Sequence, residues 1–317
     1  MREFIAAKND SNQRLDKFLS KLCPNMPQSM LYKSLRKECV KINSKHIKDA
    51  SYIIKEGDNI KLFLKDEFFE KPTEKTNFQN VTPDFKIIYE DDSILIIDKA
   101  VGVVVHDDDR GTVNTLAAQI KKYLYDKKEY DPNDENTFVP SLCNRLDRNT
   151  GGIIIAAKTA EALRVMNQKI KDRELKKTYL CVVLGTLSKK QGELKGFLFK
   201  DEKEKRVYVY DTSKKGTKTI ITKYKVLKEK NNLSLVEVEL VTGRTHQIRA
   251  HFSSIGHPLL GDGKYGKNTV NKEHKMLTQA LYSYKLSFDF STPAGELEYL
   301  NKKTFMVDDV YFLKIFE

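Results

Sequence analysis

Residues 143–158 read CNRLDRNTGGIIIAAK and join a charged segment to an apolar one. The run at 153–157 is short and apolar, which is typical of a buried β-strand. If the preceding residues are extended, Arg145 and Asp147 project to one face while Leu146 points the opposite way, into the core. The stretch therefore predicts a core strand with charged groups gathered at its beginning.

The residues alone leave two interpretations of these charges open. An exposed Arg–Asp ion pair at the start of a strand contributes about 0–1 kcal/mol and needs no function. The turn NTGG at 149–152, however, lets two backbone segments approach closely, and the rigid strand after it can hold a carboxylate in place. Asp147 is therefore a candidate for chemistry as well as for an ordinary ion pair.

The surrounding sequence predicts an α+β domain with a mixed, mainly antiparallel sheet. Strand patterns occur at 93–98, 101–106, 178–185, 218–227 and 233–241, the last two joined as a hairpin through Asn231-Asn232. Helical spacing occurs at 115–124 and after Thr159. A further helix is expected after a Thr245 cap, with Ile248, Phe252 and Ile255 inward and Gly256 at its end.

The first 64 residues predict a small α/β module of their own. They carry 13 Lys or Arg against 7 Asp or Glu. About half of the net charge of +12 thus lies in a fifth of the 317 residues, which favours a module that binds nucleic acid. Lys33, Arg36 and Lys37 lie on the polar side of its second predicted helix. Residues 65–84 read as a linker, and 85–317 as the larger α+β domain.

Several function classes lose support. The four cysteines are far apart, so neither a disulfide framework nor a zinc site is expected. No apolar run approaches the ~20 residues of a membrane span and no signal peptide is evident, so a cytoplasmic protein is expected. The loops G-x-x-x-x-G-K-[ST] and G-x-S-x-G are missing from the sequence, and no G-x-G-x-x-G follows a predicted strand.

Two further segments carry polar groups suited to a site. In VTGRTHQIRAH (241–251), Arg244 comes just before a predicted helix, where backbone N–H groups favour an anion. His246, His251 and His257 lack the spacing of a helical ligand pair, and HDDD at 106–109 reads as a solvated turn, so no metal is expected. Tyr179 begins a strand behind two lysines, which suits either a core residue or a base-stacking platform.

Together, NRLDRNTGGIIIAAKT, KKTYLCVVLG and GRTHQIRAHFSSIGHPLLGDGKYG resemble the RNA pseudouridine synthases of the RluA family. The likeness covers roughly residues 85–300. The first 64 residues resemble the small RNA-binding module first known from a ribosomal small-subunit protein.

The resemblance implies roles for four residues. Asp147 corresponds to the catalytic aspartate, Tyr179 to the tyrosine beside the target base, and Arg244 to the arginine that pairs with the aspartate. Arg145 corresponds to the arginine that takes the place of the flipped-out nucleotide. The sequence departs from the usual family pattern at Asn144, Asn149, Gly151 and Ala100. None of these positions is one of the four residues just named. In the N-terminal module Pro27-Gln28-Ser29 and Cys39 depart from the usual pattern.

The implied activity is isomerisation of uridines in structured RNA, with large-subunit ribosomal RNA as the expected target. It needs no cofactor, and a monomer is expected. Alternatives are a transfer-RNA pseudouridine synthase and a non-catalytic RNA-binding protein. A glycosidase-like hydrolase would need a second carboxylate at a fixed distance, and no obvious partner lies near Asp147 in the sequence.

Overall fold

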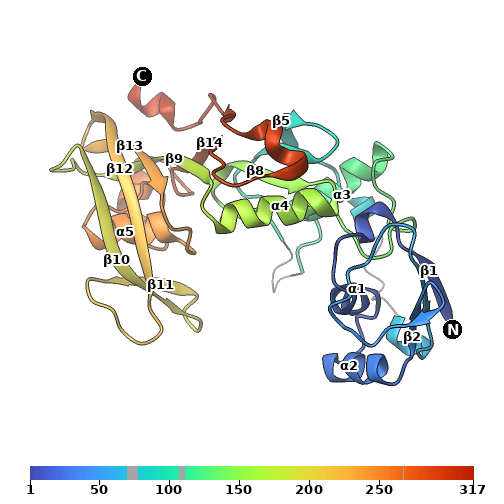
Figure 1. Ribbon diagram of the computed structural model, residues 1–317. Coiled ribbons are helices and arrows are strands. Elements are labelled where there is room, and N and C mark those ends of the chain that lie inside the picture. The colour runs from blue at the N-terminus through green and yellow to red at the C-terminus, as the bar shows by residue number, and fades with distance from the viewer. Residues whose placement is uncertain (70–77, 107–110, 267) are drawn as a thin grey trace.

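The computed structural model describes residues 1–69, 78–106, 111–266 and 268–317 (Figure 1). It contains two sheets: a four-stranded one in the N-terminal lobe and an eleven-stranded one in the remainder. The predicted α+β class with a mixed, mainly antiparallel sheet is confirmed. Within the described ranges, no helix is long and apolar enough to cross a membrane.

The N-terminal lobe packs two helices on its small sheet. Its elements are β1 (Arg2–Ile5), η1 (Lys8–Asp10), α1 (Leu15–Leu22), α2 (Gln28–Arg36), β2 (Val40–Ile42), β3 (Lys45–His46), β4 (Asn59–Leu62) and η2 (Asp66–Phe69). Leu15, Phe18, Leu19 and Leu22 are buried on one face of α1, because residues spaced three and four apart lie on the same side of a helix. The N-terminal strand β1 was not predicted from the sequence; it pairs with β4.

Both ends of the segment predicted as a linker pack against neighbouring structure. Phe69, at the end of η2, is buried in the N-terminal core beneath the guanidinium of Arg2. Phe78 is buried in the core of the large lobe. Residues 70–77 lie outside the described ranges. The two aromatic side chains explain the packing, because each buries a large apolar area.

The large lobe is organised around the strand that the opening stretch predicted. Its strands are β5 (Phe85–Glu90), β6 (Ile94–Lys99), β7 (Ser141–Leu142), β8 (Gly151–Ala157), β9 (Leu175–Leu184), β10 (Gln191–Asp201), β11 (Arg206–Tyr210), β12 (Lys218–Lys230), β13 (Leu233–Leu240), β14 (Leu281–Phe288) and β15 (Thr304–Met306). The helices are α3 (Leu116–Asp126), α4 (Ala160–Lys171), α5 (Gln247–Ser254), α6 (Asn268–Glu273), η4 (Gly295–Leu300) and η5 (Leu313–Phe316).

Strand β8 lies between β6 and β14, and all seven of its residues are buried. Its side chains divide between two cores. Ile154 and Ala156 pack with α3 and α5, whereas Ile153, Ile155 and Ala157 pack with α4. A strand covered on both faces reads as a continuous apolar run, which explains why the sequence identified it.

The run at 101–106, predicted as a strand, is irregular. Gly102 has a left-handed φ of 94°, and the carbonyls of Val104 and Val105 accept hydrogen bonds from the first N–H groups of α3. The apolar side chains therefore serve a turn that leads into a helix, with Val105 buried in the core.

The two lobes contact each other through polar groups. Buried Asp10 accepts hydrogen bonds from Asn136 Nδ2 at 2.7 Å and Thr137 Oγ1 at 2.6 Å. Asn9 accepts one from the first N–H of α4, at Ala160. Figure 1 shows the N-terminal lobe at one end of the molecule, beyond α3.

Gly152 is required where β8 meets β14 as a parallel pair. It has a φ of 114°, and an added Cβ would lie 2.2 Å from the carbonyl oxygen of Ser283. A side chain here would strain the backbone and push apart the two strands that support Arg145-Leu146-Asp147, the RLD segment.

We expect Gly152→Ala to lower the free energy of unfolding by about 2–3 kcal/mol more than Gly102→Ala. The matched control has a similar φ of 94° but nothing within 4 Å of its added Cβ, so it isolates the steric clash from backbone strain. Urea denaturation measures both variants. Equal losses would show that the approach of β14 does not require a glycine.

Candidate active site

The RLD segment is an irregular, extended turn just before β8. Leu146 is buried in the core, Arg145 is exposed, and the side chain of Asp147 is 27% exposed. Asn144 ties the segment to β8, since its Oδ1 accepts from the Ile155 N–H at 2.8 Å and its Nδ2 donates to the Ile153 carbonyl. The alternation of faces predicted from the sequence is present, although the segment is not itself a strand.

Asp147 forms its ion pair with Arg249, not with Arg244. Arg249 Nη1 donates to Asp147 Oδ2 at 3.1 Å. The same guanidinium binds Asp262 through Nε at 2.7 Å and Nη2 at 3.0 Å. Asp262 is fully buried, which holds the guanidinium in one orientation. The predicted pairing of Arg244 with the aspartate is therefore wrong.

The start of α5 explains this correction. Thr245 does not cap the helix; His246 occupies the N-cap position with a left-handed φ of 51°. Arg244 lies before this bend and is exposed, whereas Arg249 lies inside the helix beside buried Ile248. Ile255, predicted to face inward, is 40% exposed at the helix end. The position of Arg249 next to apolar residues of α5 was the available sequence signal.

His246 is the second group at the carboxylate. Its Nε2 lies 3.8 Å from Asp147 Oδ2, and its Nδ1 shares a hydrogen bond of 2.9 Å with Tyr265 Oη. Burial lowers the pKa of His246, and the nearby Asp147 charge partly opposes this effect. From the sequence, His246 was considered only as a possible metal ligand, and no metal site was expected.

Tyr179 lies in β9 and lines the same cleft as Asp147. Its side chain is 6% exposed. Burial raises its pKa to about 12, and the charge of Asp147 adds to the shift. The tyrosine therefore keeps its proton near neutral pH, with a largely apolar ring beside the carboxylate.

Lys99 was not predicted as a site residue, although it supports the same turn. It is fully buried, and its Nζ donates to the carbonyls of Ala100, Val103 and Arg148. Burial lowers its pKa to about 8, against the opposing effect of Asp147. A lysine at the end of an apolar strand was the available signal. It joins the turn after β6 to the backbone next to Asp147.

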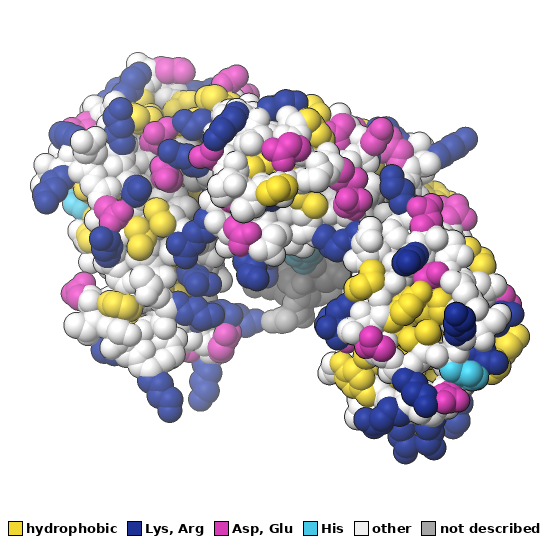
Figure 2. All heavy atoms as spheres, viewed as in Figure 1, with side chains coloured by type: hydrophobic (Ala, Val, Ile, Leu, Met, Phe, Trp, Pro, Cys, Tyr) yellow, Lys and Arg dark blue, Asp and Glu magenta, His cyan; other side chains and the backbone are white. Residues whose placement is uncertain are grey.

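Asp147, Tyr179, His246 and Arg249 line a cleft of about 1360 Å³. Besides Arg249, the cationic side chains that line it are Arg145, Arg148, Lys171, Arg173, Lys177 and Arg244. In Figure 2, Lys and Arg side chains gather around the hollow below α4. A cleft in which cationic side chains predominate attracts a polyanion such as RNA.

The described residues contain no cluster of three or more His, Cys, Asp or Glu side chains that could hold a metal ion. His251 is buried and hydrogen-bonded to Thr222, and His257 shares a hydrogen bond with the Leu184 carbonyl. Residues 107–109 of the HDDD turn lie outside the described ranges.

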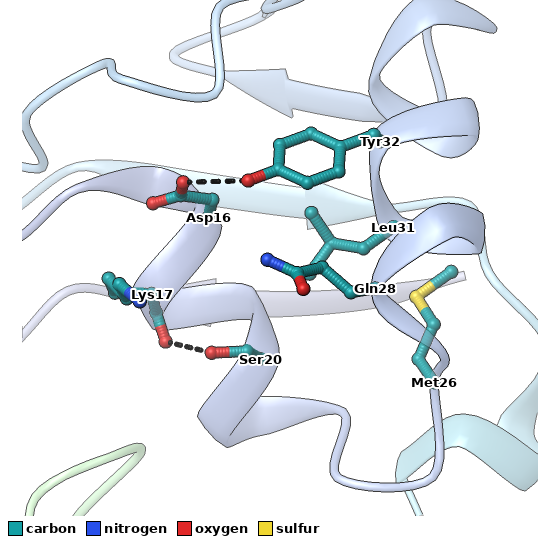
Figure 3. A pocket seen from close by; sticks show the side chains of 7 residues that line it. All are labelled: Asp16, Lys17, Ser20, Met26, Gln28, Leu31 and Tyr32. Atoms are coloured by element: carbon teal, nitrogen blue, oxygen red, sulfur yellow. Dashed lines mark hydrogen bonds between the residues drawn. The ribbon is translucent and has the colours of Figure 1, made fainter. Parts of the chain in front are cut away.

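The N-terminal lobe presents a second, smaller site. Lys33, Arg36 and Lys37 are exposed on and just after α2. Between α1 and α2 lies a pocket of about 210 Å³ (Figure 3). Tyr32 donates to Asp16 across one side of it, at 3.3 Å, and the amide of Gln28 lies between the helices. The lobe therefore combines exposed cations with a small polar recess.

Both parts of the chain are similar to known protein families. Residues 93–254 match the RNA pseudouridylate synthase family, and residues 13–60 match the S4 domain. An uncharacterized RNA pseudouridine synthase of Mycoplasma capricolum is 31% identical over 306 residues, which cover 96% of both chains. The ribosomal large subunit pseudouridine synthase C of Rickettsia bellii is 35% identical over 84% of this chain and 87% of that relative.

Among solved structures, human RNA pseudouridylate synthase domain containing 1 has the same fold, with a TM-score of 0.57 and 21% identity. The match covers 78% of this chain and 89% of the human one. Fold, cleft and domain pair together define an RNA-modifying isomerase. The chain belongs to the RNA pseudouridine synthase family, which confirms the resemblance found in the sequence.

We expect Arg249→Ala to lower the free energy of unfolding by about 3–5 kcal/mol, because it leaves Asp262 buried without its cation. Arg249→Lys keeps the positive charge but loses the bidentate geometry, so its free energy of unfolding should lie between those of the wild type and Arg249→Ala. Arg244→Ala removes an exposed arginine, and we expect a change within about 0.5 kcal/mol. Urea denaturation compares the three variants. Equal losses for the two alanine variants would contradict the pairing seen here.

Proposed function

We propose that this protein isomerises specific uridines of large-subunit ribosomal RNA, with Asp147 as the catalytic carboxylate. The observation that carries the proposal is the Asp147 carboxylate, held against Arg249 within a cationic cleft. The target is supported by relatives from Rickettsia bellii and Vibrio parahaemolyticus that are named ribosomal large subunit pseudouridine synthase C.

The chemistry suits a fixed carboxylate. The bond between C1′ of the ribose and N1 of uracil must break, the uracil must rotate, and C5 must bond to C1′. Positive charge develops at C1′, and an anion beside it stabilises that charge or bonds to it. Asp147 reaches into the cleft while Arg249 fixes its orientation. The carboxylate therefore meets the sugar in a constant geometry.

The other residues of the cleft suit a nucleotide that leaves its helix. Flipping a nucleotide costs a few kcal/mol. Exposed Arg145, two residues before Asp147, takes the place that the nucleotide vacates, and the ring of Tyr179 packs on the uracil. Arg244 stands exposed on the cleft lining, so we assign it to the RNA backbone.

The N-terminal module supplies additional RNA contacts through Lys33, Arg36 and Lys37. The proposed division is a module at 1–64, a linker at 65–84 and a catalytic domain at 85–317. The hydrogen bonds of Asp10 to Asn136 and Thr137 hold the module against the catalytic domain. The protein acts as a cytoplasmic monomer in this proposal.

We expect Asp147→Asn to reduce uridine conversion by about three orders of magnitude or more, since the amide carries no negative charge. The measurement incubates ribosomal and transfer RNA separately with each protein and maps carbodiimide-resistant adducts by primer extension. Asp66→Asn, whose side chain is 79% exposed, is the matched control and should keep wild-type activity.

Adducts on ribosomal RNA that depend on Asp147 support the proposal. Adducts confined to transfer RNA would assign the other target. Identical maps for wild type and Asp147→Asn would rule out the carboxylate.

A further inference from the structure

His246 occupies a constrained position whose purpose the proposed reaction leaves open. A left-handed conformation is unfavourable for a residue with a side chain and is retained where the surroundings impose it. Here it directs the imidazole to the catalytic carboxylate, with Nδ1 on Tyr265 Oη at 2.9 Å and Nε2 3.8 Å from Asp147 Oδ2. The side chain is 17% exposed and lines the cleft.

The isomerisation requires a base after the new bond has formed. Once C5 is bonded to C1′, it still carries its own hydrogen and is tetrahedral. Removal of that proton returns the C–H electron pair to the ring as the C5–C6 double bond. The C6–N1 double bond opens at the same time, its electron pair moves to N1, and N1 gains a proton. The net result moves one proton from C5 to N1, so no oxidant, reductant or co-reactant is consumed.

We propose that His246 Nε2 accepts the C5 proton, with Nδ1–H donating to Tyr265 Oη. The imidazolium then returns its proton to N1 directly or through solvent. The inference rests on the proposed role of Asp147, because it places C1′ at that carboxylate. It applies whether Asp147 attacks the sugar directly or promotes elimination, since both routes end in the same tetrahedral C5.

The neighbouring groups favour this assignment over the other candidates. Tyr179 has a pKa of about 12 and holds its own proton near neutral pH. Burial likewise raises the pKa of Cys143 to about 12. Lys99 Nζ is fully buried and donates to three carbonyls, so it is not directed into the cleft. Burial lowers the pKa of His246 and its Nε2 faces Asp147, which suits a base near neutral pH.

The groups around His246 act on its protonated form in both directions. Burial, Arg249 and Lys264 lower its pKa, while Asp147 and Asp262 raise it. Tyr265 Oη also accepts the Val207 N–H at 3.0 Å, which fixes the hydroxyl in place. When Asp147 regains its full negative charge at the end of the reaction, it stabilises the imidazolium 3.8 Å away. The imidazole becomes neutral again when the proton leaves.

The test uses His246→Gln in the full-length protein, with RNA carrying uridine or [5-²H]uridine at the target site. We expect a fall of about 100-fold in the single-turnover rate, the range of a lost general base. The deuterium isotope effect should rise above the wild-type value, because C5 deprotonation becomes limiting. His257→Gln, a histidine bonded to the Leu184 carbonyl, is the matched control and should leave both unchanged.

The pH profile gives an independent readout. Because burial lowers the pKa of His246, the wild-type rate should have reached its maximum at neutral pH. The rate should decrease as the pH drops below the usual imidazole pKa of about 6.5. This acid limb of the pH profile should be absent in His246→Gln. If that variant does not fold, Tyr265→Phe replaces it. Loss of the acceptor on Nδ1 should move the acid limb to lower pH.

A slower His246→Gln enzyme with the wild-type isotope effect and acid limb would overturn the inference and leave a structural role. An unchanged rate would overturn it as well. Failure of the proposed function is recognised separately: Asp147→Asn would then retain activity, whatever the result at His246.

Discussion

The site depends on one guanidinium shared by two carboxylates. Arg249 binds fully buried Asp262 through Nε and Nη2 and reserves Nη1 for Asp147. A buried carboxylate without a cation is costly, so Asp262 fixes the guanidinium strongly. Asp262 also accepts the backbone N–H groups of Lys264 and Tyr265. The orientation of the Asp147 carboxylate is thereby tied to the loop that follows α5.

The fold brings these groups together through its core. Leu146, beside Asp147, and Ile248, beside Arg249, are buried in the same apolar cluster. Each charged residue is thus placed by an apolar neighbour in the sequence, although the two are about a hundred residues apart. Lys99 fastens the same turn from the side of β6. Strand β8, covered on both faces, supplies the rigid support beneath it.

Local patterns predicted much of this fold. The apolar run of β8, the helical spacing of α3, the Thr159 cap of α4, and the hairpin through Asn231-Asn232 are properties of short segments. Asp147 and Tyr179 could be named because each lies on or beside a strand that the sequence identified.

The other features of the fold and the site depend on contacts between residues that are far apart in the sequence. Arg244 and Arg249 lie in one short motif, and the left-handed turn at His246 decides which of them faces inward. No periodicity reports that turn, because a single left-handed residue leaves no repeating pattern in the sequence. The run at 101–106 has the composition of a strand, but its carbonyls are used by α3 and Lys99. Phe69 and Phe78 became core residues through packing that a linker composition does not reveal.

The most direct test of this account is a double-mutant cycle on the single-turnover rate of uridine conversion, combining Asp147→Glu with Arg249→Lys. The lengthened carboxylate loses its alignment with Arg249, so Arg249→Lys should slow the wild-type background much more than the Asp147→Glu background. We predict a coupling of at least about 1 kcal/mol, a factor of about five in rate. Independent, multiplicative effects of the two substitutions would contradict the claim that Arg249 acts by holding the catalytic carboxylate.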